Sequence, residues 1–445
     1  MRWLGGSLAL LLCLMLLGTH AAAHVDWEVT EWLDDRKELA QRRFWVFFED
    51  KGLHLYSPEE LAKEEAHLLK RNLLALQRRF QGHYPSWSES DWPVHPAYIK
   101  KALLAHPALV LSQQSRWNNA VSMCFSGEWN QHDHKQALSL LTALPFVSRV
   151  SMVAQFVKKA PILEDSVPLS RVNEASNEQI KYGNSYQQLQ MMDVPSLHSS
   201  GLDGHGVTIL ILDSGFNLDH PAIKNLYIPQ QHDFVNDDDD VTDQTFDKIE
   251  GSDPENHGTM TLSCVGGKDP GKHYGPAYAS TYLLAKTESM LIEDPVEEDY
   301  LISGLEWGEA LGANIATASL GYQPWHSYNS KNGTVLLDTT IDFLVEQRGV
   351  VAFISVGNDH RENLGPAVPG DAKRALSVGA IYENGDITTF SSQGPTFDGR
   401  IKVITSNELR PSPNVYQPEI VALGYGVQVA NYRFSSGELY VKGSG

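Results

Sequence analysis

The second half of the chain alternates short apolar runs with helical patterns. Continuous apolar runs predict strands buried on both faces at residues 207–212, 281–286, 314–319, 350–356 and 375–381. Between these runs, apolar residues at helical spacing predict helices at residues 257–265, 298–311 and 337–347. Strands that alternate with helices predict an α/β fold, a doubly wound layer with a mainly parallel sheet.

The first half has a different pattern. It predicts a strand at residues 44–48, a long helix at 58–79, a second helix at 134–144 and a strand at 147–157. This order is typical of a small α+β unit of the ferredoxin-like kind. Residues 158–198 are polar and show no pattern, so we expect an exposed linker there. The predicted division is a leader at 1–23, an α+β domain at 24–165, a linker at 166–198 and the α/β domain at 199–445.

The N-terminal leader has the pattern of a secretory signal. Arg2 precedes an apolar run from Leu8 to Leu17, and Ala21, Ala22 and Ala23 then form a small-residue cleavage site. The alternative is a single membrane anchor, but the apolar run is short against the ~20 residues that a spanning helix needs. We therefore expect a secreted, extracellular product that begins near His24 and has no membrane partner after signal cleavage.

Composition and charge narrow the function classes. Hydrophobic residues make up 42% of the chain and charged residues 20%, which predicts a globular protein rather than a disordered chain or a multispan membrane protein. The formal net charge of −20 disfavours a nucleic-acid partner, because phosphates would be repelled. Three cysteines cannot form a disulfide scaffold, and none has a His or Cys partner at metal-ligand spacing.

Three polar residues lie at the ends of predicted elements of the α/β half. Asp213 ends the strand at 207–212, His257 opens a helix, and Asn358 follows the apolar strand at 350–356. Sites in such folds form at the carboxyl ends of the strands. A carboxylate, an imidazole base and an amide donor suit acyl transfer, which needs proton transfer and stabilisation of an oxyanion. Asp before His along the chain is also the start of one of the known orders of a Ser-His-Asp triad.

The second half, from about Gly204 to Gly445, resembles the subtilase (subtilisin-like) family of serine endopeptidases. The matching motifs are Ile211 to Gly215, His220-Pro221, His257-Gly258-Thr259 through Gly266-Gly267, Ser319-Leu320-Gly321, Gly357-Asn358 and Phe390 to Pro395. The resemblance implies that Asp213 orients His257, that His257 is the general base and that Asn358 binds the oxyanion. It implies that Ser319, Leu320 and Gly321 pair with an extended protein or peptide substrate. The first half resembles the family's propeptide, a prodomain that assists folding and acts as an intramolecular inhibitor.

The sequence departs from the family pattern near its C-terminal end. The family's serine sits in a Gly-Thr-Ser motif, and Gly445 matches the glycine of that motif. The nucleophile is therefore expected two residues beyond Gly445, Ser444 is not assigned, and the chain as given is expected to be inactive. Residues 403–417 separate Lys402 from the Pro418 segment, and they are either a surface insertion or a gene-model error. Leu423 replaces the family's usual proline.

The leading interpretation is a secreted serine endopeptidase that is made as a zymogen and hydrolyses peptide bonds with a Ser-His-Asp triad. The alternative is a non-catalytic peptide-binding pseudoprotease that keeps the cleft and has lost the nucleophile. The prediction for the first half is a separable prodomain, whose tail lies extended in the cleft and pairs with Ser319 to Gly321.

Two further features of the sequence suggest surface sites. Asn332-Gly333-Thr334 is a glycosylation sequon in a polar stretch and is expected to be exposed. Asp237 to Asp240, with Asp233 nearby, suggest either a solvated acidic loop or a calcium site that adds stability. Neighbouring carboxylates cannot all converge on one ion, so we assign no metal ligand and expect no required cofactor.

Overall fold

A computed structural model describes most of the chain. The described residues are 23–26, 29, 43–126, 131–153, 181–242, 255–289, 295–322, 326, 330–359, 365–394, 396, 418–432 and 437–445. They form two compact units. The first contains residues up to 56, 93–114 and 119–152, and the second contains residues 57–92, 115–118 and 153–445.

The first unit is an α+β domain built on one sheet. The sheet has the order β1-β5-β2-β4-β3, and β2 pairs antiparallel with both β4 and β5. Helices α5 and α6 follow β2 and β4 along the chain, which gives the predicted ferredoxin-like order of strand, helix, two strands, helix and strand. The elements are β1 (His24–Val25), β2 (Arg43–Phe48), α5 (Pro96–Leu103), β3 (Leu109–Ser115), β4 (Ala120–Phe125), α6 (Gln131–Thr142) and β5 (Val147–Met152).

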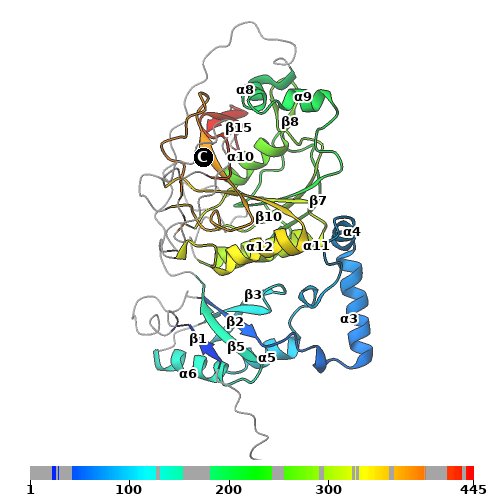
Figure 1. The fold of residues 1–445 in the computed structure, drawn as a ribbon, viewed down its shortest axis with the longest axis vertical. Coiled ribbons are helices and arrows are strands. Elements are labelled where there is room, and N and C mark those ends of the chain that lie inside the picture. The colour runs from blue at the N-terminus through cyan, green and yellow to red at the C-terminus, as the bar shows by residue number, and fades with distance from the viewer. Residues whose placement is uncertain are drawn as a thin grey trace, which may run out of the picture. The chain divides into compact units, whose positions relative to one another are not determined.

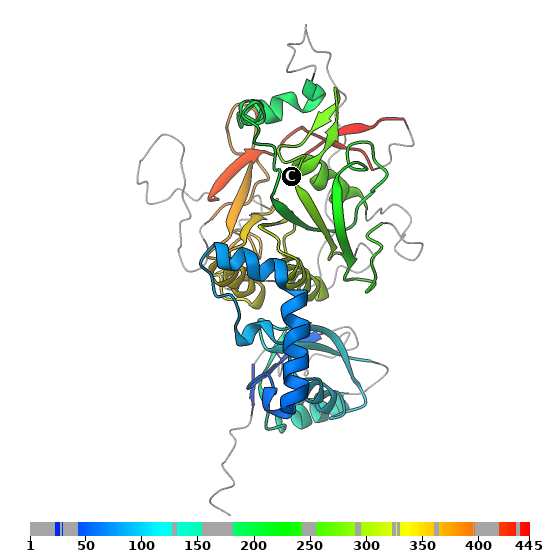
Figure 2. The same cartoon turned by 90° about the vertical axis from the view of Figure 1, so that its right-hand side faces the viewer.

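Two consecutive helices interrupt this order along the chain and belong to the second unit. Helix α3 (Pro58–Arg71) begins with a capping box, in which Ser57 Oγ accepts from the Glu60 N–H and the Glu60 carboxylate accepts from the Ser57 N–H. The single helix expected at 58–79 is divided at Asn72, whose side chain donates to the Leu68 carbonyl and competes with the helical backbone. Helix α4 (Leu73–Gln81) then continues after a sharp bend (Figure 2).

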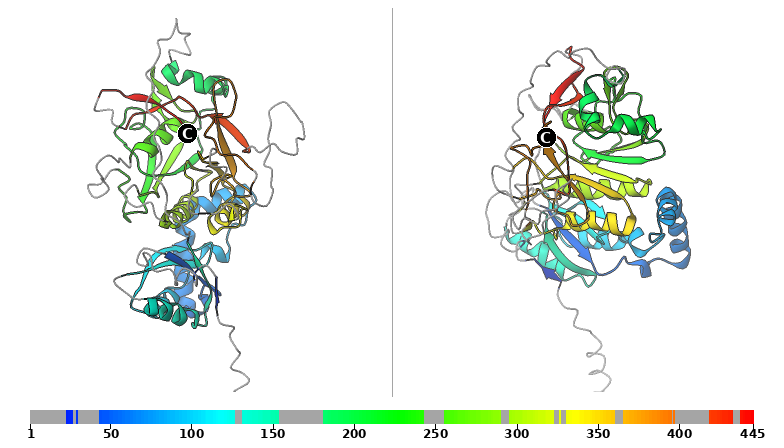
Figure 3. Two further views of the ribbon diagram at one scale, coloured as in Figure 1. Left: turned by 90° about the vertical axis from the view of Figure 1, so that its left-hand side faces the viewer. Right: turned by 45° about the horizontal axis from the view of Figure 1, so that its top comes forward.

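The second unit is organised by a seven-stranded parallel sheet with the order β14-β13-β12-β11-β6-β10-β7 (Figures 1 and 3). All five predicted strands are present. The strands are β6 (Thr208–Asp213), β7 (Tyr227–Asp233), β10 (Thr281–Lys286), β11 (Ile315–Ala318), β12 (Val351–Ser355), β13 (Leu376–Ile381) and β14 (Ile420–Leu423). The two strands that the pattern missed, β7 and β14, are the edge strands.

Helices cover both faces of this sheet, as the doubly wound fold requires. Ile209 and Ile211 of β6 pack in one core cluster with Leu262 of α10. The alternate residues Leu210 and Leu212 face α11, where glycines at 304 and 308 allow close approach. The helices are α10 (Glu255–Gly266), α11 (Val296–Ala310) and α12 (Leu336–Arg348). Two small antiparallel ribbons complete the unit, β8 (Lys268–Asp269) with β9 (His273–Tyr274) and β15 (Val427–Ala430) with β16 (Tyr440–Gly443).

The expected linker at 166–198 needs a correction. Residues 154–180 lie outside the described part of the chain, but the following stretch is folded into η4 (Gly183–Ser185), α8 (Tyr186–Gln190) and α9 (Val194–Ser199). Tyr182, Leu189 and Val194 form a buried cluster with Tyr274. These elements are too short to show a hydrophobic period, so the sequence pattern did not predict them.

The predicted signal, residues 1–23, lies almost wholly outside the described residues. In the part of the chain that the structure describes, no helix is both long and apolar enough to cross a membrane.

Candidate active site

Asp213 lies at the carboxyl end of the central strand β6 and is fully buried. Its Oδ1 accepts from the Ser214 N–H at 2.8 Å, and its Oδ2 accepts from Thr261 Oγ1 at 2.8 Å. A buried carboxylate is retained in its charged form only where hydrogen bonds replace water. These contacts hold the carboxylate in one orientation, with Oδ1 also facing His257.

His257 lies in the first turn of α10, as predicted. Its Nδ1 is 2.7 Å from Asp213 Oδ1, and its side chain is 46% exposed. An imidazole that donates Nδ1–H to a buried carboxylate has its tautomer fixed, so that Nε2 carries the lone pair that can accept a proton. The close approach depends on Gly258, because a Cβ there would come within 2.1 Å of the Gly215 carbonyl oxygen.

Asn358 follows the carboxyl end of β12, and its side chain is exposed. Strands β6, β11 and β12 are adjacent and parallel, so Asp213, Ser319 and Asn358 all follow the same edge of the sheet. The chain approaches Asn358 again at Gly445, where a Cβ would lie 3.8 Å from Asn358 Nδ2. Gly445 is held there by a hydrogen bond from its N–H to the Gly424 carbonyl at 2.9 Å.

The segment Ser319 to Gly321 continues from β11 at the same edge. Ser355 Oγ donates to the Leu320 carbonyl at 2.9 Å, which fixes the segment against β12. Gly321 approaches residue Ala367, since a Cβ on Gly321 would lie 2.8 Å from the Ala367 Cβ. Ser319 is exposed and Leu320 is buried, so the backbone of this segment is held in place beside the Asp213 and Asn358 positions.

Two polar partners of Asp213 were not singled out in the sequence. Thr261 lies four residues after His257, one helical turn along α10, so both side chains share a helix face. That spacing is the signal that could have identified Thr261. Ser214 donates to Asp213 Oδ1 through its backbone N–H at 2.8 Å and through its hydroxyl at 3.3 Å.

Comparisons with known proteins show which family this sequence matches. Residues 204–435 match the model of the subtilase family, Peptidase S8, over slightly more than half of the chain. The chain belongs to the subtilase family. Residues 43–166 match the Peptidase S8 propeptide domain described for Bacteroidota.

Individual relatives are distant. Subtilisin amylosacchariticus of Bacillus subtilis subsp. amylosacchariticus is 24% identical over 212 residues, which cover 47% of this chain and 50% of that protein. The subtilisin-like protease PopC of Myxococcus xanthus is 28% identical over 215 residues, which cover 45% and 43%. A cold-adapted subtilisin-like serine proteinase of known structure aligns with a TM-score of 0.39 and 23% identity, covering 55% of this chain and 70% of that one. The chain thus spans about half the length of these curated relatives.

Ser444 has a local backbone contact in this subtilase. Its Oγ accepts from the Gly426 N–H at 3.2 Å, which ties the end of β16 to the turn before β15. Ser444 stays unassigned.

The sequon at Asn332 is less exposed than expected. Asn332 is half-buried, Gly333 is buried with its N–H donating to Asp371 Oδ2 at 3.0 Å, and Thr334 is exposed. Thr334 Oγ1 donates to Asn332 Oδ1 within the sequon. The sequon lies just before α12. Its glycosylation stays a prediction.

Carboxylates of the acidic stretch near β7 contact neighbouring residues of the chain. Asp233 is buried and pairs with Lys286 Nζ at 2.9 Å, and its two oxygens also accept from residues Val235 and Asn236. Asp237 and Asp239 are exposed and lie beside His232. Among the described residues, no group of three or more His, Cys, Asp or Glu side chains is arranged to hold a metal ion. Stabilisation by calcium stays a prediction.

A buried histidine in the same unit is expected to make the free energy of unfolding sensitive to acid. His273 is fully buried, its Nε2–H donates to the Ser263 carbonyl at 2.9 Å, and burial lowers its pKa to about 4. The unfolded chain takes up this proton near pH 6.5 while the folded chain does not, so stability is lost as the pH falls from about 6.5 towards 4. Between pH 7.5 and 5.5 we expect wild type to lose about 1.4 kcal/mol more unfolding free energy than His273→Gln, which keeps a donor for Ser263.

Urea denaturation at the two pH values measures this difference. His205→Gln is the matched control, because the His205 side chain is exposed, and it should follow the wild-type pH dependence. Equal pH dependence of wild type and His273→Gln would show that His273 does not titrate as proposed.

Proposed function

We propose that this chain is the prodomain and most of the catalytic domain of a secreted serine endopeptidase that is made as a zymogen. The observation that carries the proposal is the 2.7 Å contact of His257 Nδ1 with the buried Asp213 Oδ1, beside Asn358 at the same edge of the sheet. In this proposal His257 is the general base, Asp213 orients it and stabilises the imidazolium, and the Asn358 amide donates to the tetrahedral oxyanion.

The nucleophile in this proposal is a serine two residues after Gly445. Family membership supports the assignment, because the family motif places Thr and Ser after the glycine that Gly445 matches. The geometry also supports it, since Gly445 lies beside Asn358 Nδ2. A serine close to both Asn358 and His257 could attack a carbonyl whose oxygen faces the amide donor.

The substrate in this proposal is a protein or peptide bound in extended form. Ser319 to Gly321 would supply backbone donors and acceptors for an added strand, because this segment continues from β11 beyond its last paired residue. No metal or cofactor takes part in the proposed steps, which need only proton transfer and oxyanion binding. The prodomain would act as an intramolecular inhibitor until it is removed.

An active-site-directed phosphonylating probe tests the proposal. The complete gene product should be labelled by a fluorophosphonate on a serine after Gly445 and should cleave a fluorogenic peptide, because His257 activates that hydroxyl. The 445-residue chain should show neither reaction, and a Ser444→Ala variant serves as a control for reaction at Ser444. Absence of labelling in the complete gene product would instead favour a peptide-binding pseudoprotease.

A further inference from the structure

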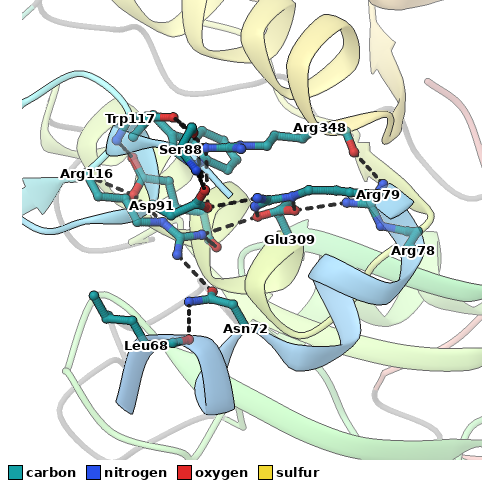
Figure 4. A network of polar contacts seen from close by, with 12 residues as sticks. Leu68, Asn72, Arg78, Arg79, Ser88, Asp91, Arg116, Trp117, Glu309 and Arg348 are labelled. Atoms are coloured by element: carbon teal, nitrogen blue, oxygen red, sulfur yellow. Dashed lines mark hydrogen bonds and ion pairs between the residues drawn. The ribbon is translucent and has the colours of Figure 1, made fainter. Parts of the chain in front are cut away.

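The second unit has buried ion pairs near both ends of the strands of its parallel sheet. One pair joins Arg79 to Glu309, with Arg79 Nε donating to Glu309 Oε1 at 2.8 Å and both side chains 0% exposed (Figure 4). Glu309 lies in the last turn of α11, and Asn314, just beyond that helix, exchanges hydrogen bonds with Thr208 at the first residue of β6. This pair therefore lies toward the amino ends of the strands, opposite the end that carries Asp213.

The other pair joins Lys286, the last residue of β10, to Asp233, the last residue of β7. Lys286 Nζ lies 2.9 Å from Asp233 Oδ2, and the two side chains are 1% and 0% exposed. The strands are parallel neighbours in which these two residues are partners in the register (Figure 1). This pair therefore lies at the carboxyl ends of the strands, where the candidate catalytic site is.

Lys286 is also the neighbour of Asp213. The two residues are partners in the register of β10 and β6. Leu284 of β10 and Ile211 of β6, each two residues earlier, pack in one cluster with Leu262 of α10. Because side chains alternate between the faces of a sheet, Lys286 and Asp213 extend from that same face, which α10 covers. The order across three neighbouring strands on this face is carboxylate, ammonium, carboxylate.

Asp233, the outer carboxylate of this row, has several donors of its own. Its Oδ1 accepts from the Val235 and Asn236 N–H groups at 2.8 and 3.0 Å, and its Oδ2 accepts from Asn236 Nδ2 at 2.8 Å. Hydrogen bonds to a carboxylate favour its charged form. Asp233 can therefore stay buried as a carboxylate in a variant that lacks the Lys286 ammonium.

The place of Lys286 in the row gives its charge an effect on the site. Neighbouring strands are about 5 Å apart, so Lys286 is one strand spacing from Asp213, whereas Asp233 is two. The positive charge is thus the nearer member of the ion pair, and buried charges are screened much less than charges in water. A nearby positive charge favours a carboxylate and disfavours an imidazolium.

We propose that Lys286 is a positioning residue of the active site, whose buried ammonium favours the charged form of Asp213 and the neutral form of His257, so that the base is available at lower pH. The inference rests on the proposed function, in which His257 is the general base. Lys286 acts through Asp213 and His257 rather than by contact with a substrate, because its side chain is 1% exposed and its ammonium pairs with Asp233.

Charged groups on other elements also act on His257. Asp219 lies in the loop after β6, and Glu288 follows β10. Asp359, in the loop after β12, interacts electrostatically with Lys331, which is buried. None of these residues is substituted in the variants below, so their effects are the same in wild type and variant.

NMR of the 445-residue chain measures the titration of His257 without any catalytic activity. Histidines are labelled at Cε1, and the His257 signal is identified by its absence in His257→Gln. Lys286→Met removes the charge and keeps a long side chain, and it should raise the midpoint of the His257 titration by about 0.5 to 1 pH unit. The double variant Lys286→Met/Asp233→Asn should show a smaller rise, because the more distant negative charge is removed as well.

Lys272→Met is the matched control. The Lys272 side chain is 54% exposed and pairs with Asp269, so the same substitution there should move the His257 midpoint by less than about 0.1 pH unit. Near-ultraviolet circular dichroism checks the fold of each variant. If Lys286→Met does not fold, the double variant decides the matter, because it loses the nearer positive charge and leaves neither member of the pair buried alone.

A His257 midpoint that is the same as in wild type, in either folded variant, would overturn the proposal. A purely structural role of Lys286 would lower the Tm of the variants and leave the midpoint in place. In the complete gene product, the acid limb of kcat/KM should move to higher pH by the same amount as the midpoint. A moved midpoint without fluorophosphonate labelling of the complete gene product would reject the peptidase proposal alone, and labelling with an unmoved midpoint would reject only the role of Lys286.

Discussion

Replacing His257 by alanine in the complete gene product should lower kcat for a fluorogenic peptide by on the order of 10⁶-fold, a magnitude that comes from a triad histidine knockout in a subtilisin. Without the imidazole, no group accepts the serine proton or protonates the leaving amine. KM should change little, because His257 contacts Asp213 rather than the segment at Ser319 to Gly321. The remaining rate would come from oxyanion binding and substrate positioning.

The design of this experiment has to separate catalysis from maturation. A variant that cannot process itself would keep its prodomain, so parent and variant are both released by an engineered cleavage site. His205→Ala is the control, since the His205 side chain is exposed and outside the site, and its kcat should stay within twofold of the parent. A His257→Ala enzyme whose kcat equalled that of the parent would rule out a general-base role.

Asp213→Asn should lower kcat by about 10⁴-fold. The amide is nearly isosteric, so the Ser214 and Thr261 contacts leave the strand end in place, but a neutral group stabilises the imidazolium poorly and favours the wrong tautomer. We expect a kcat loss with KM nearly unchanged, because Asp213 is buried and acts through His257.

Asp219→Asn provides the comparison for this variant, since Asp219 is an exposed carboxylate six residues further along the chain. Its kinetics should match the parent. Thermal unfolding of both variants separates a change of mechanism from a loss of structure. If Asp213→Asn lowered stability and kcat together, and KM rose in proportion, the residue would hold the site together rather than orient His257.

The strands and helices of the α/β half could be predicted because burial leaves a regular pattern of apolar residues along the sequence. Interior strands such as β6 and β10 are buried along nearly their whole length and appear as continuous apolar runs. The edge strands could not be predicted in this way: β7 contains Pro229 followed by four polar residues in succession. An edge strand tolerates these residues because it pairs on only one side in the described sheet. The helix break at Asn72 likewise depends on one side-chain hydrogen bond that has no periodic signature.

By itself, the sequence determined the fold class, the order of Asp213, His257 and Asn358 along the chain, and their places at the ends of elements, because local pattern and parallel topology fix which residues follow a strand. Only the tertiary structure decided the 2.7 Å contact of Asp213 with His257, the support from Thr261, and the pairing of Arg79 with Glu309, 230 residues apart. Such contacts join side chains that are distant in sequence. Their geometry depends on packed backbones whose separations no local pattern records.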